Sequence, residues 1–487
     1  MCAQKNLACH KLVNRVPVHY CLLNLGSPSL PCSPFKDKKA LAKLDNLFTR
    51  QVLAPMKYYT AAETWSRDEI AARQVTRLKN SIEQAMKSPF YGNRYQKAGI
   101  RPDSISHADD ICRLPFTTKT DLRNAYPFNA LAVPQHELVR LHASSGTTGS
   151  PVAIFHTQDD LDTWADLMAR CMFMVGIRKT DIFQNIAGYG LFTGGLGIHY
   201  GAERLGCLTV PAGTGNTKRQ LKLISDMKVT ALHIIPSYAL YLGRALEEEG
   251  IDPRSLSPRI ALIGAEPHTE EVRQRIEYLL GLKAYNSYGL SEMNGPGVAF
   301  ECLAQNGLHI WEDAYIPEIV DPETGEHVAE GEVGELVMTT LTRRGMPILR
   351  YRTRDLTRFL PGECVCGRKH RRMDRILGRV DDMFIIKGCN VYPMQIEHAL
   401  MAFPEVGENY LIILEHTENM DNIRIQVEIR NESFVEDMRV LTSLQKRIAR
   451  AIHDEILVTP KIDLVQANSL PKAEGKAVRV QDKRTTV

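Results

Sequence analysis

Helical and strand patterns alternate through the middle of the chain, and this alternation constrains the fold more than any other feature of the sequence. Expected strands span 181–186, 231–235, 259–263 and 283–286, and expected helices span 161–175, 220–227, 238–249 and 270–279. Strands that alternate with helices predict an α/β domain, with helices packed on a sheet. Ligands of such sheets bind at the carboxyl ends of the strands.

A run of small hydroxyl residues and glycines lies between two apolar segments, 138–141 and 152–155. Its residues are Ser144, Ser145, Gly146, Thr147, Thr148 and Gly149, followed by Ser150 and Pro151. Glycine N–H groups and hydroxyls can surround phosphate oxygens, so the run predicts a phosphate-binding loop. An ordinary polar turn has the same composition. The P-loop pattern of NTPases is excluded, because it requires Gly-Lys-Ser/Thr with a helix directly after it.

Composition excludes several classes of protein. The 487 residues are 44% hydrophobic and 24% charged, which is typical of a soluble globular chain with room for two or more domains. The net charge of +3 favours neither nucleic acid nor a membrane as a partner. No segment reaches the roughly 18 to 20 apolar residues of a spanning helix. The 11 cysteines are scattered, which indicates reduced thiols and a cytoplasmic protein.

The two ends of the chain differ in pattern. Residues 1–55 show no sustained periodicity, and we expect this extension to be disordered or not translated, with Met56 as a plausible start. Near the other end, expected helices at 394–402 and 440–457 flank expected strands at 409–415 and 423–429. These elements predict a compact α+β domain.

Five ordered motifs resemble those of the adenylate-forming superfamily of acyl-CoA synthetases. They are the Ser/Thr/Gly run, Tyr288–Glu292, Arg350–Asp355, Gly378–Asp382 and Leu470–Lys476. Within the superfamily the chain most resembles the phenylacetate-CoA ligases, through Tyr189–Gly197, Gly295–Val298 and Gly475–Val480. The resemblance runs from about Tyr59 to the C-terminus. It implies a large N-terminal adenylate-forming domain of sheets and flanking helices, 56–379, joined by a hinge to a small α+β domain, 380–487.

The resemblance implies a two-step ligation that uses ATP, Mg²⁺ and coenzyme A. An aryl acid attacks ATP to give an acyl-adenylate and pyrophosphate, and coenzyme A then displaces AMP. Phenylacetate is the leading acid, with indoleacetate or hydroxyphenylacetate as alternatives. Transfer to a carrier-protein thiol or to water, and a non-catalytic nucleotide-binding protein with structural zinc, are the competing functions. A homodimer is also implied.

The resemblance assigns roles to individual residues. Lys476 bridges the carboxylate and the α-phosphate, Glu292 holds Mg²⁺, and Asp381 is the hinge. The remaining nucleotide-binding residues are Ser144, Ser145, Gly146, Thr147, Thr148 and Gly149 for phosphates, Asp355 and Arg379 for ribose or phosphate, and Asn286 and Tyr288 for adenine. Without this context, Glu292 and Lys476 would be ordinary solvated residues. One departure concerns the phosphate loop, which carries Ser150 in place of the superfamily's usual lysine.

Aromatic residues and glycines near two expected strand ends suggest an acid pocket. The candidates are Tyr189, Phe192, Gly194, Gly264 and Ala265, which could form a flat apolar slot for an aryl ring. The two aromatic side chains could equally be core residues.

Three cysteines and a histidine form a second candidate site. Cys302 and His309 are close in sequence, as are Cys364 and Cys366, and a Cys₃His set is typical of a closed tetrahedral zinc site. Such a site would be structural. The alternative is four unrelated side chains.

Overall fold

The computed structural model describes residues 57–143, 151–191, 193–387, 389–417, 420–430, 438–470 and 478–484, apart from the side chains of Glu408 and Thr417. The chain divides into two units, Met1–Met56 and Lys57–Val487, and the described residues all belong to the second. None of the described helices is long and apolar enough to cross a membrane.

A nine-stranded sheet forms the centre of the large domain. Five neighbouring strands run parallel in the order β7-β6-β5-β3-β4, with bounds Lys283–Leu290, Ile260–Gly264, Ala231–Ile234, Ile182–Asn185 and Leu208–Val210. Antiparallel strands extend the sheet beyond β7, namely β8 (Gly295–Glu301), β9 (Leu308–Ile310), β14 (Arg372–Met373) and β13 (Phe359–Leu360). The α/β architecture expected from the alternation is confirmed.

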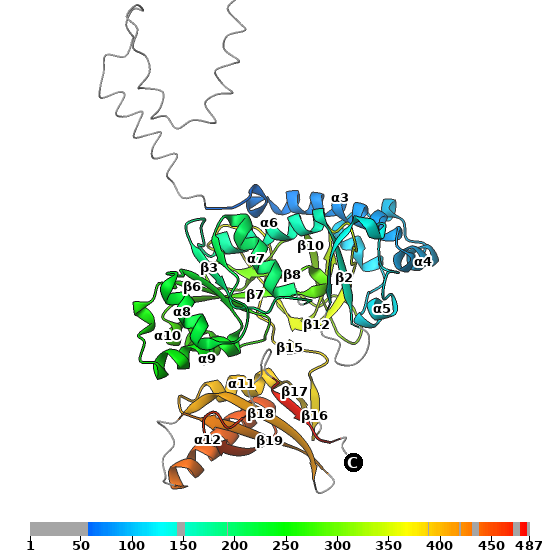
Figure 1. Ribbon diagram of the computed structural model, residues 1–487. Helices are drawn as coiled ribbons and strands as arrows, with labels where there is room; N and C mark the ends of the chain where they lie inside the picture. The colour runs from blue at the N-terminus through cyan, green and yellow to red at the C-terminus, as the bar shows by residue number, and fades with distance from the viewer. Residues whose placement is uncertain are drawn as a thin grey trace, which may run out of the picture. The chain divides into compact units, whose positions relative to one another are not determined.

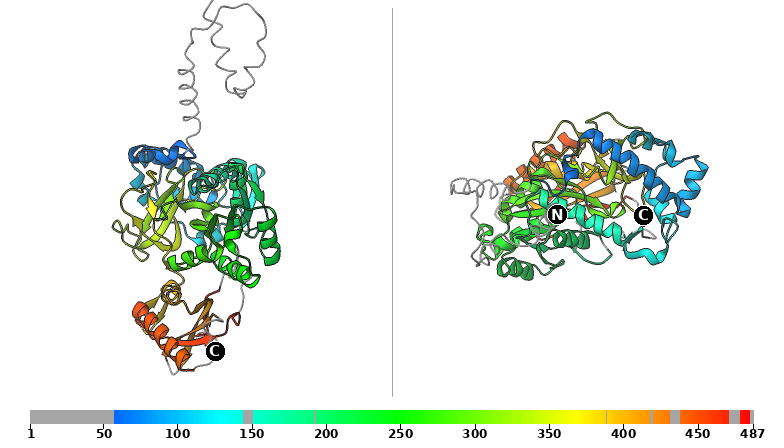
Figure 2. Two further views of the ribbon diagram at one scale, coloured as in Figure 1. Left: turned by 90° about the vertical axis from the view of Figure 1, so that its left-hand side faces the viewer. Right: turned by 90° about the horizontal axis from the view of Figure 1, so that it is seen from above.

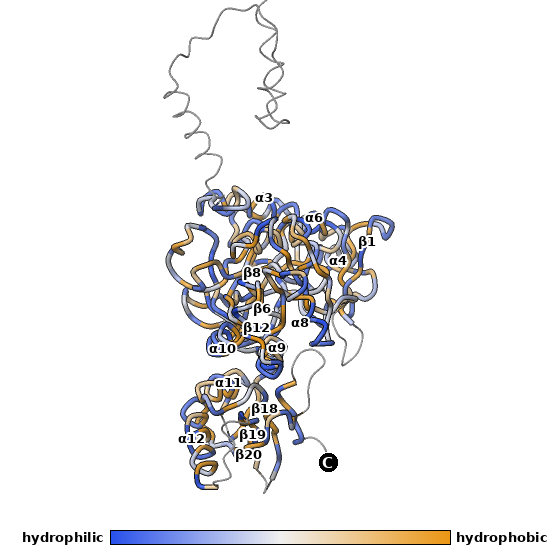
Figure 3. Tube along the Cα trace, turned by 60° about the vertical axis from the view of Figure 1, so that its left-hand side comes forward, coloured by the Kyte–Doolittle hydropathy of each residue, from blue (hydrophilic) through white to orange (hydrophobic). Residues whose placement is uncertain are grey.

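Helices cover both faces of the parallel strands (Figure 1). One face packs against α6 (Gln158–Met174) and α7 (Thr193–Leu205), and the other against α8 (Thr217–Asp226), α9 (Pro236–Glu248) and α10 (Glu270–Leu280). Successive strand residues point to opposite faces, so Ala231 joins the first core and Leu232 the second. Figure 3 shows the resulting contrast between hydrophobic strands and the largely hydrophilic α8 and α10.

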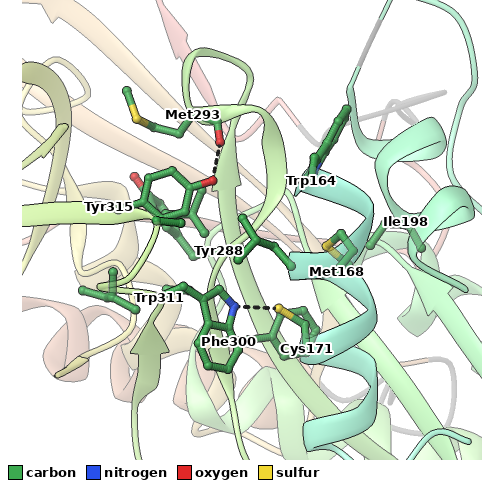
Figure 4. Close-up of a cluster of buried hydrophobic side chains, with 14 of the residues drawn as sticks. Trp164, Met168, Cys171, Ile198, Tyr288, Met293, Phe300, Trp311 and Tyr315 are labelled. Atoms are coloured by element: carbon green, nitrogen blue, oxygen red, sulfur yellow. Dashed lines mark hydrogen bonds between the residues drawn. The ribbon is translucent and has the colours of Figure 1, made fainter. Parts of the chain in front are cut away.

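Side chains from α6 interlock with the sheet in the first core (Figure 4). The indole Nε1 of Trp311 donates to Cys171 Sγ at 3.1 Å, and the hydroxyl of Tyr315 donates to the Met293 carbonyl at 3.0 Å. Each of these buried polar atoms therefore has a partner, which avoids the cost of burying it alone.

Two segments differ from the sequence-based expectation. Thr193–Gly195, expected in a glycine-rich turn, begins helix α7. The glycines suit close helix packing, because a Cβ on Gly197 would lie 2.1 Å from the indole of Trp164 on α6. The strand expected to end at Asn286 continues to Leu290, and β8 begins at Gly295, so the loop between them is short.

A second, four-stranded sheet has the order β10-β11-β12-β15, with bounds Tyr315–Val320, Gly334–Thr340, Tyr351–Thr357 and Gly378–Arg379. The expected pair of strands around the Ser/Thr/Gly run is confirmed as an antiparallel hairpin, β1 (Leu138–Ala143) and β2 (Ala153–Thr157). The helices before it are α3 (Arg67–Met86), α4 (Pro89–Lys97) and α5 (Lys119–Asn124).

The C-terminal part has a hydrophobic core of its own, built from residues between Phe384 and Ile462. Its four-stranded sheet has the order β20-β19-β18-β21, with bounds Lys461–Val465, Met420–Ile429, Val406–Thr417 and Val480–Asp482. Helices α11 (Pro393–Met401) and α12 (Met438–Ile456) supply the core's helical side, and a small hairpin joins β16 (Phe384–Ile386) to β17 (Cys389–Val391). Figure 2 shows α12 along the strands.

Candidate functional site

A cavity of about 1050 Å³ opens at the carboxyl ends of the parallel strands. Its lining includes residues that directly follow β3, β5 and β6, such as Ile186, Ile235 and Ala265, together with the end of β7. The alternating pattern of the sequence predicts a binding site at this edge of the sheet.

Most described candidate residues line this cavity. They are Gly194, Ala265, Asn286, Tyr288, Glu292, Asp355, Arg379 and Asp381. The phosphate-loop candidates 144–149, with Ser150, Phe192 and the catalytic candidate Lys476, lie outside the described residues.

Two acid-pocket candidates do not line the cavity. The side chain of Tyr189 is 37% exposed, and its hydroxyl accepts from Asn185 Nδ2 at 2.9 Å. Gly264 packs against β7, because a Cβ there would lie 2.4 Å from the carbonyl oxygen of Ser287. The close approach of β7 therefore leaves no room for a side chain at position 264.

Asp355 is the centre of a hydrogen-bonded group on one wall of the cavity. It lies opposite Arg379 in the β12–β15 pairing, and the Arg379 guanidinium donates to its Oδ1 at 2.6 Å. The hydroxyl of Tyr288 donates to Asp355 Oδ2 at 2.7 Å. Arg379 also holds Asp381 through two hydrogen bonds of 3.0 Å.

Burial shifts the pKa values of Asp355 and Tyr288. It raises the pKa of Asp355, and the neighbouring Arg379 charge acts in the opposite direction. Burial also raises the pKa of Tyr288 well above its usual value, and the negative charge of Asp355 adds to this effect. Tyr288 therefore remains a hydrogen-bond donor at neutral pH.

Glu292 is buried in the short segment between β7 and β8. Its Oε1 accepts from the hydroxyl of Tyr351 at 2.9 Å, and its backbone carbonyl accepts from Arg343 at 2.7 Å. A carboxylate fixed in this way presents a hard oxygen ligand, the type that Mg²⁺ takes in proteins.

Backbone strain accompanies the site. Ala265 and Arg354 both have φ of 68°, in the left-handed region that favours glycine, and both line the cavity. Strained residues of this kind are concentrated at functional sites.

The four zinc candidates come together around the antiparallel strands of the nine-stranded sheet. Cys302 directly follows β8, His309 lies on β9, and Cys364 and Cys366 lie between β13 and β14. One ligand atom from each residue lies within 4.8 Å of all the others. The sulfurs of Cys302 and Cys364 are 3.6 Å apart, close to the about 3.8 Å expected for two thiolates on one tetrahedral zinc ion.

The surroundings of the four side chains favour metal binding. His309 Nδ1 lies 3.4 Å from the His370 carbonyl, which orients the ring with Nε2 toward Cys366 Sγ, also at 3.4 Å. Hydrogen bonding with His309 lowers the pKa of Cys364, and thiolate is the metal-binding form of cysteine.

Three residues of the site had no assigned role in the sequence-based interpretation. Tyr351, inside the Arg350–Asp355 motif, contacts Glu292, and Asn185 contacts His233 at the carboxyl ends of β3 and β5. The sequence could have pointed to Asn185 and His233, because both lie near the carboxyl ends of expected strands.

Family models match most of the described chain. The model for AMP-binding enzymes matches residues 65–342, and the model for the C-terminal domain of AMP-binding enzymes matches residues 388–484.

Curated relatives and solved structures agree with these models. The phenylacetate-coenzyme A ligase of Pseudomonas putida is 44% identical, covering 89% of this chain and 98% of the relative, and that of Thermus thermophilus is 45% identical, covering 88% and 100%. The structure of 2-hydroxyisobutyryl-CoA ligase in its postadenylation state, with an acyl-AMP bound, has a TM-score of 0.84 at 30% identity, covering 89% of this chain and 94% of that one. In its thioesterification state the same ligase has a TM-score of 0.66 at 31% identity, with the same coverage.

Proposed function

The chain belongs to the phenylacetate-CoA ligases of the AMP-binding enzyme family, and from this premise we propose that it joins phenylacetate, or a close arylacetate, to coenzyme A at the expense of ATP. The carboxylate oxygen attacks the α-phosphorus and pyrophosphate leaves; the thiol sulfur then attacks the acyl carbon and AMP leaves. The observation that carries the proposal is the buried Asp355 on the cavity wall, held by Tyr288 and Arg379.

Asp355 and its neighbours supply the ribose site in this proposal. A carboxylate accepts hydrogen bonds from two vicinal hydroxyls at once, and charge-assisted bonds of this kind are stronger than neutral ones. Arg379 opposes the effect of burial on the pKa of Asp355 and holds the carboxylate in place. Asn286 and Tyr288, which line the same cavity, face the adenine.

Glu292 is the proposed Mg²⁺ ligand. Its buried carboxylate lines the cavity, and the donor Tyr351 fixes one of its oxygens, so the chemistry of the site fits a hard cation. A bound Mg²⁺ supplies charge neutralisation for the pyrophosphate leaving group.

Residues outside the described ranges complete the proposed adenylation site. The 144–149 loop donates to the phosphates, and the ammonium of Lys476 orients the carboxylate and the α-phosphate and offsets charge in the transition state. These two roles rest on the motifs Ser144–Gly149 and Leu470–Lys476 and on family membership.

Asp381 is the proposed hinge between a large domain, 56–379, and a C-terminal domain, 380–487. It stands between the short strands β15 and β16, and hinge residues are positions at element ends that absorb a large φ/ψ change. The separate hydrophobic core of the C-terminal part supports this division.

Structural zinc at Cys302, His309, Cys364 and Cys366 is part of the proposal. Four protein ligands fill a tetrahedral site and leave no position for substrate, so zinc there would tie the loop after β13 to strands β8 and β9. A homodimer in the cytoplasm, implied by the resemblance and the thiol content, completes the proposal and is testable by size-exclusion chromatography and cell fractionation.

AMP formation with ATP, Mg²⁺ and phenylacetate, measured with and without coenzyme A, tests the function. AMP release that depends on coenzyme A supports the ligase. Equal AMP release without coenzyme A would point to water or another thiol as the acceptor and would contradict the proposal.

A further inference from the structure

A histidine lines the cavity together with the acid-pocket candidates Gly194 and Ala265. His233 is on β5, is 4% exposed, and lines the cavity together with Ala187, Thr193 and Gly194. It lies directly opposite Asn185 of the parallel neighbour β3, so the two side chains share one face of the sheet. That face packs against α7, whose first turn contains Gly194.

Hydrogen bonds around Asn185 fix which ring nitrogen of His233 carries a proton. Asn185 Nδ2 donates to the carbonyl oxygen of Gly195 at 2.7 Å, and a carbonyl can only accept, so the amide orientation is determined. Asn185 Oδ1 therefore faces His233 Nδ1 at 3.0 Å and must accept from it. Nδ1 carries the hydrogen.

The other ring nitrogen is then a bare acceptor. Burial lowers the pKa of His233 to about 4, so the ring is neutral at pH 7 and Nε2 has no hydrogen. Among the described residues, none donates to this Nε2, although the ring lines the cavity. Nε2 is not one of the enclosed atoms of the described residues, so it opens into the cavity as an acceptor to which a ligand can donate.

We propose that His233 Nε2 accepts a hydrogen bond from the ring of the acid, and that the preferred substrates are arylacetates bearing a ring O–H or N–H group. Hydroxyphenylacetates and indole-3-acetate belong to this class, whereas phenylacetate does not. The inference rests on the proposed ligase function and narrows its substrate.

Pairs of acids of equal size test the hydrogen bond apart from shape. We would measure kcat/KM for coenzyme A-dependent AMP release with 4-hydroxyphenylacetate against 4-methylphenylacetate, and with indole-3-acetate against benzothiophene-3-acetate. In at least one pair, kcat/KM should be higher for the donor-bearing acid by about tenfold or more. The reason is that its isostere fills the same space and leaves His233 Nε2 without a donor. Ratios near one in both pairs would overturn the inference.

Two variants connect the preference to His233. His233→Met should bring the ratio to within about twofold of one, because methionine keeps the bulk and is only a weak acceptor. Asn185→Asp should hold the ring as an imidazolium whose Nε2 donates, and should abolish the preference for indole-3-acetate, whose N–H can only donate, whereas the hydroxyl of 4-hydroxyphenylacetate can still accept. An unchanged ratio in both variants would contradict the assignment.

A second buried histidine provides the control. His268 also lines the cavity, but its Nδ1 contacts the Glu266 carbonyl at 3.2 Å, and its Nε2 is enclosed by protein without a partner among the described residues, so it cannot reach a ligand in the cavity. His268→Met should change all acids alike and leave the ratio as in the wild type. Absence of coenzyme A-dependent AMP release with every acid would refute the ligase function itself, whereas turnover with no donor preference would refute only the role of His233.

Discussion

The guanidinium of Arg379 donates to Asp355 at 2.6 Å and to both oxygens of Asp381 at 3.0 Å, so one side chain connects the proposed ribose ligand to the proposed hinge. Asp355 is buried, whereas the side chain of Asp381 is 52% exposed. The bond to Asp381 is therefore the weaker of the two, because solvent screens it. A rotation at Asp381 can break it and leave Asp355 paired.

Asp355→Asn should weaken ATP binding. The amide keeps the shape of the carboxylate but loses its charge, and it cannot accept with both terminal atoms. We expect a loss of about 2 kcal/mol, or about thirtyfold in kcat/KM for ATP, with a smaller change in KM for the acid. Steady-state kinetics with each substrate varied in turn measures this. Equal losses for ATP and the acid would contradict a ribose role.

Lys476→Ala should slow acyl-adenylate formation by about a hundredfold or more. Loss of one preorganised charge at the reacting centre costs about 10² to 10³ in rate. Exchange of labelled pyrophosphate into ATP, which reports the first step alone, should fall by this factor while ATP binding changes little. Lys472→Ala, in the same Leu470–Lys476 motif, is the matched control. Normal exchange in Lys476→Ala would remove the residue from the mechanism.

Periodicity predicts the elements of this fold well where one face of an element is apolar. The expected helix 270–279 is observed as Glu270–Leu280, and the expected strand 231–235 as Ala231–Ile234. Helix α7 was not predicted, because glycines in a sequence usually indicate a turn. In the structure these glycines allow the helix to pack closely against Trp164.

The sequence alone identified those site candidates that belong to a recognisable motif. Asp355 and Glu292 belong to such motifs, and both line the cavity. The pairing of Asn185 with His233 depends on the register of two parallel strands 48 residues apart, and sequence pattern does not specify register between strands joined by a crossover.

Asp381→Pro should separate the two half-reactions. Proline fixes φ and would prevent the rotation, so adenylation should remain within about threefold of the wild type while thioester formation falls by about a hundredfold. Single-turnover assays of each step measure both rates. Asp381→Asn preserves backbone freedom and alters only the contact with Arg379, so it should retain both steps. Parallel loss of both steps in the proline variant would exclude a hinge role.

Zinc removal should destabilise the protein. We expect about one zinc ion per chain, and Cys364→Ser should lower both zinc content and the melting temperature, the latter by about 5 °C or more. Cys207→Ser, a buried cysteine outside the cluster, is the control and should retain the metal. Elemental analysis and thermal unfolding measure the two quantities. Metal-free wild-type protein with the same melting temperature would contradict the proposed site.

His233 should make the protein less stable in mild acid. Its pKa in the folded state is about 4, below the usual 6.5, because burial disfavours the charged ring. Between these values the unfolded chain binds more protons, so the contribution of His233 is complete above pH 6.5 and is lost as the pH falls toward about 4. The loss is about 1.4 kcal/mol per pH unit over this window.

The slope of stability against pH isolates this contribution. Urea unfolding of the wild type and of His233→Met at several pH values between 4 and 7 should give a free energy of unfolding that falls less steeply in the variant, by about 1.4 kcal/mol per unit. Identical slopes in the wild type and in His233→Met would mean that the ring titrates alike in both states. The ring would then be partly protonated near pH 7 rather than wholly neutral.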